Sequence, residues 1–526
     1  MPAAPAQGPR SWLVPALLGL AIAAFGVLAV ALGQGNGWDL RNYHLYDGWA
    51  FWAGRPQDLA AAQLQTWFNP LLSSATWLLF VHTPPWLSSL LLGLVQGANL
   101  LPLYALARGH LPRTLQAGGP AWALAVAGVG AAGATQFGEL GASMGDTLVS
   151  LPLLCAWALA FRAEGPARPL LAAALAGATC GLKLTAAPFT LGLVVALPLT
   201  TTDARARTRL LVLGLLAAGL GFLATDGFWL WRLWREFGDP LYPLGGALFP
   251  GDYSAPVPLR DTRWPPRTTW EWLAYPLVWA TSPRRVSEQW FLDLRLAFLW
   301  LALPLLVWRA ARGAIAPPRA TAPLPAATRA LAIASALAYL AWLAVFGYYR
   351  YLAPLEMLAP LLLALLLVRD GARPAARLLL GVLLGLLLLG TRPPRWGHLH
   401  ERQDVFLRVE LPDLPQLDRA TVILAENEPL AFLALGFSPE VRFVRIGGNL
   451  MGPPLPAYGL DREAARRIAA GPGPLYALLA DPASPAAAAA LQRQRLHRAG
   501  DCAVVRSNLL VPPLAAWLCP LRRDED

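Results

Sequence analysis

The stretch GNGWDLRNYHLYDGWAFWAGRPQDLAAAQLQTWFNP, from Gly35 to Pro70, organises the chain. It follows a long apolar run that ends near Gly33 and is much more polar than that run. Its polar and ionisable side chains gather between positions 39 and 47, and they are Asp39, Arg41, Asn42, Tyr43, His44 and Asp47. We interpret the stretch as a loop at the outer face of a membrane.

The composition indicates a membrane protein. The chain has 526 residues, of which 56% are hydrophobic and 14% are charged, and its mean hydropathy is +0.44. An ordinary soluble protein has a charged fraction of about 25%. The net charge of +11 would suggest nucleic acid as a partner in a soluble chain. Here the basic residues lie between apolar runs, so they indicate topology, and no nucleic-acid partner is expected.

The apolar runs predict eleven membrane spans. They lie at about 12–33, 85–107, 119–137, 146–162, 168–182, 185–200, 209–229, 295–310, 330–347, 353–368 and 378–391. A further apolar segment, Leu71 to Val81, is too short to cross a bilayer. The first run resembles a signal peptide, but Gly35-Asn36-Gly37 is a poor cleavage site, so we expect an uncleaved first span.

The arginines predict the orientation of these spans. With the N-terminus inside, the cytoplasmic links hold the basic residues Arg10, Arg108, Arg113, Arg162, Arg168, Arg205, Arg207, Arg209, Arg309, Arg312, Arg319, Arg329, Arg369, Arg373 and Arg377. The same links hold only three acids, Glu164, Asp203 and Asp370, whereas the loops on the other side mix both signs. This asymmetry predicts a cytoplasmic N-terminus and an extracytoplasmic C-terminus.

We therefore expect a polytopic α-helical membrane protein with two domains. Residues 1–395 form the transmembrane domain, with outer loops at 34–84 and 230–295, and residues 396–526 form a small extracytoplasmic α/β domain. The β-like runs 421–425, 441–446, 474–480 and 502–507 alternate with helical patterns in this tail. Cys502 and Cys519 either pair there or remain free thiols, whereas Cys155 and Cys180 lie inside spans.

The long outer loop, Trp231 to Arg295, is rich in tryptophan and proline. Its tryptophans indicate either an interfacial belt with amphipathic helices lying on the membrane, or a solvated loop.

Four acids near the outer face are candidates for chemistry, because ionisable groups at membrane borders are costly. Asp39 and Asp47 lie in the first outer loop, and Glu139 and Asp146 flank the turn GELGASMGD. A carboxylate there suits deprotonation of an acceptor hydroxyl or amine, or binding of a divalent metal. For each acid the alternative is an ordinary interfacial residue.

Two cations on the same predicted side are candidates for binding phosphate. Lys183 is the only lysine of the chain, in CGLKLTAAP, and Arg350 lies in GYYRYLAPLE together with Glu356. A compact ammonium and a planar guanidinium both suit phosphate. The alternatives are chance retention of Lys183 and a buried Arg350–Glu356 ion pair.

Several kinds of site are disfavoured by the sequence. The six histidines show no HExxH or similar spacing, which argues against a zinc enzyme, and no Walker A or GxGxxG segment occurs. We therefore assign no metal ligands and no cofactor from the sequence. A divalent metal remains an open alternative.

The layout resembles the GT-C superfamily of integral membrane glycosyltransferases. The resemblance rests on the placement of WDLRNYHLYDGW after the first span, on Asp146 as a second outer acid, on GDPLYP at 238–243 and on YYRYLAPLE. Asp39 stands alone where an adjacent acidic pair is commoner in the superfamily. The likeness covers roughly residues 1–395.

The resemblance implies transfer of a sugar from a polyprenyl-phosphate donor to an extracytoplasmic glycan, lipid or protein, with inversion. It implies catalytic roles for Asp39 and Asp146. His44, Asp47, Lys183, Arg350 and Glu356 would bind substrate. It also implies a multi-pass protein of the bacterial inner membrane, with a cytoplasmic N-terminus and a periplasmic C-terminal domain. The alternatives are a lipid or polysaccharide transporter and a non-catalytic envelope assembly factor.

Overall fold

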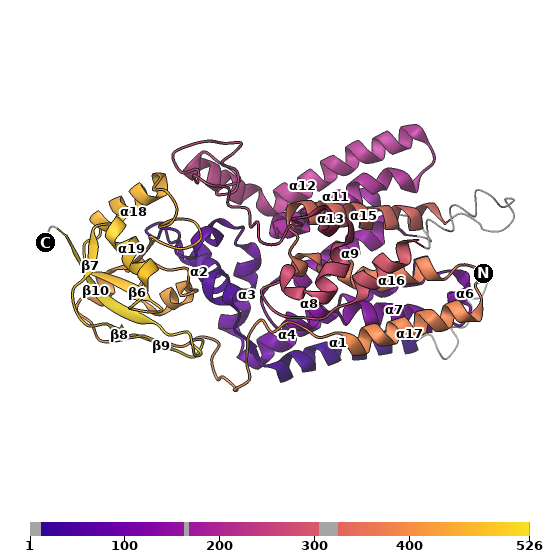
Figure 1. Ribbon diagram of the computed structural model, residues 1–526, viewed down its shortest axis with the longest axis horizontal. Helices are drawn as coiled ribbons and strands as arrows, with labels where there is room; N and C mark the ends of the chain where they lie inside the picture. The colour runs from indigo at the N-terminus through magenta and orange to yellow at the C-terminus, as the bar shows by residue number, and fades with distance from the viewer. Residues whose placement is uncertain (1–11, 163–167, 305–323, 525–526) are drawn as a thin grey trace, which may run out of the picture. The chain divides into compact units, whose positions relative to one another are not determined.

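The computed structural model describes residues 12–162, 168–304 and 324–524. The chain divides into two compact units, each assembled from three separate segments (Figure 1). The helical unit comprises Met1–Leu32, Ser89–Thr225 and Asp261–Trp396. The mixed unit comprises Gly33–Ser88, Asp226–Arg260 and Gly397–Asp526. The predicted domains were continuous in sequence, whereas these units interleave along the chain.

Apolar helices dominate the helical unit. They are α1 (Leu13–Leu32), α5 (Leu100–His110), α7 (Ala121–Ala131), α8 (Ala134–Gly138), α9 (Asp146–Ala160), α10 (Pro169–Leu182), α11 (Ala187–Ala196), α13 (Thr269–Thr281), α15 (Ala326–Val345), α16 (Ala353–Leu367) and α17 (Pro374–Gly390). Two more helices, α4 (Pro85–Gly97) and α12 (Ala204–Phe237), contribute residues to both units.

Each predicted span coincides with helix, as far as the described residues extend. Five helical segments among them are long and apolar enough to cross a membrane, namely Leu13–Leu32, Pro85–His110, Ala204–Phe237, Ala326–Val345 and Tyr349–Leu367. The other predicted spans correspond to shorter apolar helices, and the end of the span predicted at 295–310 lies outside the described residues. The chain is a multi-pass helical membrane protein by this measure, and the count of eleven crossings stays a prediction.

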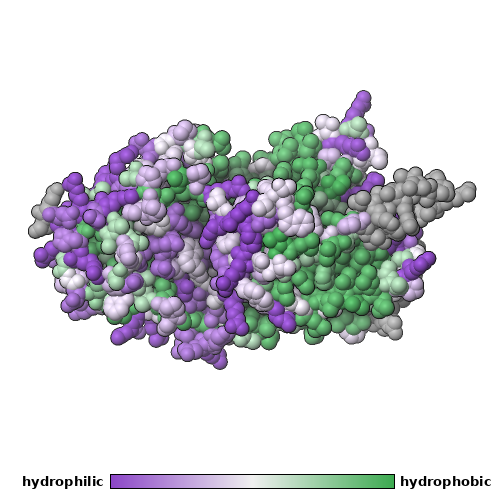
Figure 2. All heavy atoms as spheres, viewed as in Figure 1, coloured by the Kyte–Doolittle hydropathy of each residue, from purple (hydrophilic) through white to green (hydrophobic). Residues whose placement is uncertain are grey.

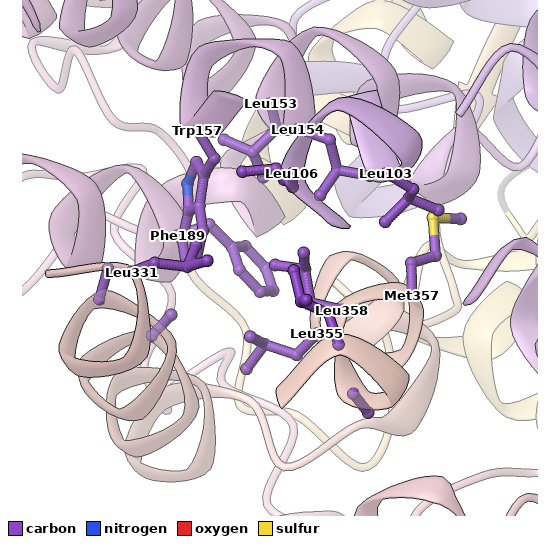
Figure 3. Packing of buried hydrophobic residues seen from close by; sticks show 14 of the residues in the cluster. Leu103, Leu106, Leu153, Leu154, Trp157, Phe189, Leu331, Leu355, Met357 and Leu358 are labelled. Atoms are coloured by element: carbon purple, nitrogen blue, oxygen red, sulfur yellow. The ribbon is translucent and has the colours of Figure 1, made fainter. Parts of the chain in front are cut away.

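The core of the helical unit is a continuous apolar cluster (Figure 3). Side chains from α5, α9, α11, α15 and α16 meet there, and they include Leu103, Leu154, Trp157, Phe189, Leu331 and Met357. Trp157 and Phe189 are each 1% exposed, so the unit buries large side chains within its own core. Figure 2 shows hydrophobic residues gathered over its helices, as expected for a lipid-facing surface.

The mixed unit is built on a sheet of order β5-β4-β6-β10-β7, and β8 pairs with β10. Strands β4 (Thr421–Leu424), β5 (Arg442–Arg445) and β6 (Leu475–Leu479) are parallel, and β10 (Trp517–Arg523) runs antiparallel to β6, β7 (Leu496–Arg498) and β8 (Ala503–Val504). Helices α18 (Gly459–Ala469) and α19 (Pro485–Arg493) alternate with the strands. The expected small α/β fold is therefore present, with Cys502 and Cys519 joined by a disulfide.

The first outer loop packs onto this sheet. Leu59 forms a parallel bridge with Val444, donating its N–H to the carbonyl of Phe443 at 2.8 Å and accepting from the N–H of Arg445 at 3.0 Å. Residues 59–62 are almost completely buried. Leu59 therefore extends the sheet at the edge of β5 by a single bridge, which satisfies backbone groups of an otherwise unpaired strand edge.

A buried ion pair fixes this docking. Asp58 accepts hydrogen bonds from Arg55 Nε at 2.9 Å, from the Tyr46 hydroxyl at 2.7 Å and from the N–H of Phe443 at 2.9 Å. The Arg55 guanidinium also donates to the carbonyls of Pro439 and Val441. Both side chains are buried, so their charges depend on each other and on these hydrogen bonds.

We predict that Asp58→Asn destabilises the folded chain by about 3–5 kcal/mol, because it leaves the Arg55 charge buried without its partner. Thermal unfolding of the detergent-purified protein, followed by tryptophan fluorescence, measures this effect. The matched control is Asp418→Asn, since Asp418 pairs with Arg419 at 3.9 Å on the surface. Such an exposed pair contributes about 0–1 kcal/mol. Equal unfolding temperatures for the two variants would contradict the docking role.

Candidate functional site

A buried carboxylate bridges two cations in the helical unit. Asp146 Oδ1 lies 2.7 Å from Lys183 Nζ, and its Oδ2 lies 3.1 Å from Arg350 Nε. The contact between Arg350 and Asp146 is an ion pair by its distance. Its geometry is not that of a hydrogen bond from the Nε–H to Oδ2. Three residues that the sequence singled out separately therefore meet at one place.

Local backbone conformation places Asp146. Gly145 has φ +90°, a left-handed conformation that glycine adopts without strain, and α9 begins with Asp146 directly after it. A carboxylate in the first turn is favoured by the helix dipole. Glu139 supports the same turn, because its Oε2 accepts from the N–H and the hydroxyl of Thr147, both at 3.0 Å.

Lys183 directly follows α10, where a cation interacts favourably with the carboxyl end of a helix. Its Nζ donates to the carbonyl of Met144 at 2.6 Å as well as contacting Asp146. An ammonium has three N–H donors, and these two contacts use two of them. The side chain keeps 15% of its surface exposed, more than Asp146 at 3% or Arg350 at 8%, so Lys183 is the most accessible of the three charges.

Arg350 lies in an aromatic surrounding. It belongs to the short 3₁₀ turn Tyr349–Leu352, and its guanidinium carbon lies 5.4 Å from the ring centre of Tyr348, 5.5 Å from that of Tyr351 and 5.4 Å from that of Trp396. Aromatic faces attract a guanidinium and leave its planar edge for oxyanions. The Tyr351 ring also lies 5.9 Å from Lys183 Nζ.

Glu139 adds a second carboxyl to the cluster. It is fully buried, and burial followed by the nearby Asp146 charge raises the pKa of the Glu139 carboxyl well above its ordinary value. Arg350 and Lys183 act on this pKa in the opposite direction, so both carboxyls belong to the charge balance of the two cations.

Glu356 belongs to a different buried cluster. Its carboxylate accepts from the N–H of Thr135 at 3.1 Å and from the Thr135 hydroxyl at 2.8 Å. The expected alternative of an Arg350–Glu356 pair gives way to Arg350–Asp146. Thr135 lies in the first turn of α8, so Glu356 satisfies N–H groups at the start of that helix.

A buried arginine binds the backbone where the helix is interrupted between α7 and α8. Arg295 is fully buried, pairs with Asp293 at 2.7 Å and donates to the carbonyls of Val129 at 3.0 Å and Ala132 at 3.1 Å. Asp293 accepts from the N–H of Ala134 at 3.1 Å. The unpaired backbone groups on both sides of the break are thereby satisfied, as a membrane interior requires. Sequence reasoning missed this pair, although an Asp-x-Arg beside an apolar run was a usable signal.

The remaining predicted site residues lie in the mixed unit. Asp39 immediately precedes the π-helical turn Leu40–His44 and is partly exposed. π-helical turns are rare and frequent at functional sites. His44 is buried with its ring edge-on to Tyr43 at 4.2 Å. Asp47 is buried in α2 (Leu45–Ala53), and burial raises the pKa of its carboxyl well above the ordinary value.

The described residues offer no good metal site. Among them no group of three histidine, cysteine or acidic side chains is placed to hold an ion. The oxygens of Asp146 face Lys183 and Arg350, and one oxygen of Glu139 is used by Thr147. The residues of this cluster therefore do not fit a divalent metal, and no chemical step is assigned to one.

The fold and the cluster together define a class: a multi-pass helical membrane protein with a small α/β unit and a buried cationic site. No protein-family model and no curated protein matches the chain. Among solved structures, it is similar to the crystal structure of ArnT from Cupriavidus metallidurans bound to undecaprenyl phosphate, with a TM-score of 0.44 and 15% identity. The match covers 72% of this chain and 64% of the ArnT chain. At this level the similarity decides nothing about individual residues, so the chemistry follows from this chain's own geometry.

The α7–α8 break makes a sharp prediction about two glycines. An added Cβ at Gly133 would lie 1.7 Å from Glu356 Oε1, whereas one at Gly128 in α7 would meet nothing within 4 Å. We expect Gly133→Ala to reduce the yield of monodisperse protein in size-exclusion chromatography. Gly128→Ala should keep or improve it, since alanine favours a helix by up to about 1 kcal/mol. Similar yields of both variants would show that the break tolerates displacement of Glu356.

Proposed function

We propose that this protein is a membrane glycosyltransferase of the GT-C type, which moves a sugar from a polyprenyl-phosphate donor to an extracytoplasmic acceptor. The observation that carries the proposal is the Asp146 carboxylate between Lys183 and Arg350. The one lysine of the chain and a buried arginine both contact Asp146 in the helical unit, and such charged groups are costly in a membrane protein. A phosphate on a lipid is an anion that would reach such a site.

The geometry suits a leaving phosphate. Lys183 supplies a point charge, and Arg350 supplies a planar set of donors. Charge builds on the phosphate oxygens as the bond to the sugar breaks, and preorganised cations at that position stabilise the transition state. Asp146 holds both cations in place. This arrangement suits orientation of Lys183 and Arg350 better than proton transfer, although Asp146 was predicted as catalytic from the sequence.

The proposed reaction is a direct displacement at the anomeric carbon. Asp39 accepts a proton from the acceptor hydroxyl or amine, whose oxygen or nitrogen then forms a bond to that carbon. The bond between the anomeric carbon and the phosphate oxygen breaks, and polyprenyl phosphate leaves with the electron pair. Attack opposite the leaving group inverts the anomeric centre. His44, Asp47 and Glu356 remain proposed substrate-binding residues.

We expect Lys183→Ala and Arg350→Ala each to lower sugar transfer by about 10²–10³-fold, the usual effect of removing one donor to a developing oxyanion. Transfer of radiolabelled sugar from polyprenyl phosphate in liposomes measures this. Arg284→Ala is the matched control, because Arg284 is an exposed arginine of the same unit. Full activity of either site variant removes that residue from the phosphate site.

Asp39→Asn should reduce turnover by about 10²–10⁴-fold, the usual contribution of a positioned base. The substitution is nearly isosteric, so expression should change little. Asp47→Asn serves as the internal comparison and should be milder. Near-full activity of Asp39→Asn would remove Asp39 as the base and leave the enzyme class intact.

We further propose placement in the bacterial inner membrane with the N-terminus in the cytoplasm and the mixed unit in the periplasm. The distribution of arginines supports it. Reporter fusions at Gly118, Thr202 and Gly371 should report cytoplasm, and fusions at Arg263 and Gly471 should report periplasm. A cytoplasmic signal at Gly471 would overturn this orientation.

The enzyme class itself is tested by mass spectrometry of cell-envelope glycans in a deletion strain. Loss of one sugar substituent is the expected result. Unchanged glycans, together with movement of a polar lipid across liposomes by the purified protein, would identify a transporter instead.

A further inference from the structure

The middle segment of the mixed unit, Asp226–Arg260, exposes an unusual amount of apolar surface. Seven large hydrophobic side chains between positions 228 and 249 are at least 38% exposed, namely Phe228, Trp231, Trp234, Leu241, Leu244, Leu248 and Phe249. Among the described residues 397–524 of the same unit, three such side chains are exposed, and all are valines. We call the seven residues the apolar patch. Concentrated exposure of this kind marks a contact surface.

The loop part of the patch has a fixed conformation. Tyr242, which is 3% exposed, stacks on Phe237 at 3.9 Å and lies edge-on to Trp67 at 5.5 Å. Asp239 is buried, and its Oδ1 accepts from the N–H of Leu241 at 2.8 Å. The inner side of the loop is therefore anchored in the core of the mixed unit. The exposed leucines therefore belong to a loop whose inner side is held in place by packing and hydrogen bonds.

The helical part of the patch has two opposite stripes. Trp229 and Leu233 point into the core of the mixed unit, whereas Phe228, Trp231 and Trp234 are exposed. The guanidinium of Arg235 lies 5.9 Å from the ring centre of Trp231. Tryptophan and arginine side by side on a helix suit the boundary between lipid headgroups and acyl chains, because each has an apolar body and a polar end.

The length of α12 indicates what covers the patch. Its 34 residues extend about 51 Å at 1.5 Å per residue, whereas the hydrocarbon core of a bilayer is about 30 Å thick. A spanning α12 therefore carries several residues beyond the hydrocarbon. Three of the four aromatic residues of the patch lie in its last turns, and the exposed leucines follow within about a dozen residues of its end.

We propose that the apolar patch inserts into the bilayer at the boundary of headgroups and acyl chains, in the leaflet that the C-terminal end of α12 reaches. Charged groups of the segment have mixed signs, with Arg232 paired to Glu236 at 3.8 Å and Asp239 buried. Burial of apolar area, rather than attraction to anionic lipid, supplies the binding free energy. The proposal adopts the interfacial alternative for the long outer loop, and it does not depend on the proposed reaction.

Site-specific fluorescence in proteoliposomes tests the proposal. In a background with Cys155→Ala and Cys180→Ala, and with the Cys502–Cys519 disulfide intact, Leu248→Cys is labelled with an environment-sensitive nitrobenzoxadiazole probe. Leu248 is 74% exposed, so its replacement costs the fold little. Val511→Cys, at a position 42% exposed in the same unit, is the matched control.

The expected result is blue-shifted emission at position 248 that doxyl-labelled phosphatidylcholine quenches, with water-like, weakly quenched emission at position 511. Neutral and anionic vesicles should give the same quenching. Water-like emission at 248, equal to that at 511, would overturn the proposal. Blue-shifted emission that lipid quenchers do not reach, and that is lost on dilution into excess lipid, would also overturn it and indicate a second copy of the chain.

Discussion

The bridging of Lys183 and Arg350 by one carboxylate is the interaction on which the helical unit's chemistry depends. Two cations in close proximity repel each other, and the burial of Arg350 and partial burial of Lys183 reduce the screening of this repulsion by water. Asp146 compensates them, and its position depends in turn on the left-handed Gly145 and on the Glu139–Thr147 hydrogen bonds. The cluster is thus a preorganised charge, held by α9, α10 and the turn before α16, and little reorganisation is needed when an anion arrives.

A second polar cluster lies in the same helical unit and satisfies backbone groups there. Arg295, Asp293 and Glu356 satisfy the backbone groups freed by the break between α7 and α8, so the helix can be interrupted inside an apolar unit. Glu356 lies in the first turn of α16, close in sequence to Arg350. The contrast between the clusters is chemical. The fully buried Arg295 donates hydrogen bonds to Asp293, to backbone carbonyls and to the Thr391 hydroxyl, whereas Lys183 retains exposed surface.

Much of this could be predicted from sequence. The spans follow from hydropathy alone, because long apolar runs depend on the membrane and not on particular partners. Lys183 was a candidate because it is the only lysine of the chain. Asp146 and Arg350 were candidates because they lie at the outer ends of predicted spans. The contacts of Asp146 with Lys183 and Arg350 could not be predicted, because they depend on packing between helices far apart in the chain. The pairing of Glu356 with Thr135 instead of Arg350 depends on the same packing. The same holds for Leu59, which pairs with β5 from within the predicted catalytic loop. Strand β10 was missed because Pro520 and two arginines interrupt its apolar pattern. Helix α12 extends to Phe237, beyond the predicted 229, because hydropathy marks only the apolar part of a helix and its last turns contain charged residues.

The central claim is that the Asp146–Lys183–Arg350 cluster binds a lipid-linked phosphate, and native mass spectrometry of lipid binding tests it most directly. Purified protein is exposed to equal amounts of a polyprenyl phosphate and the corresponding uncharged polyprenol. The account predicts that the native protein retains the phosphate in preference to the alcohol, and that Lys183→Met loses this preference while still binding both isoprenoid chains. Equal retention of the two lipids by the native protein, or an unchanged preference in Lys183→Met, would contradict it.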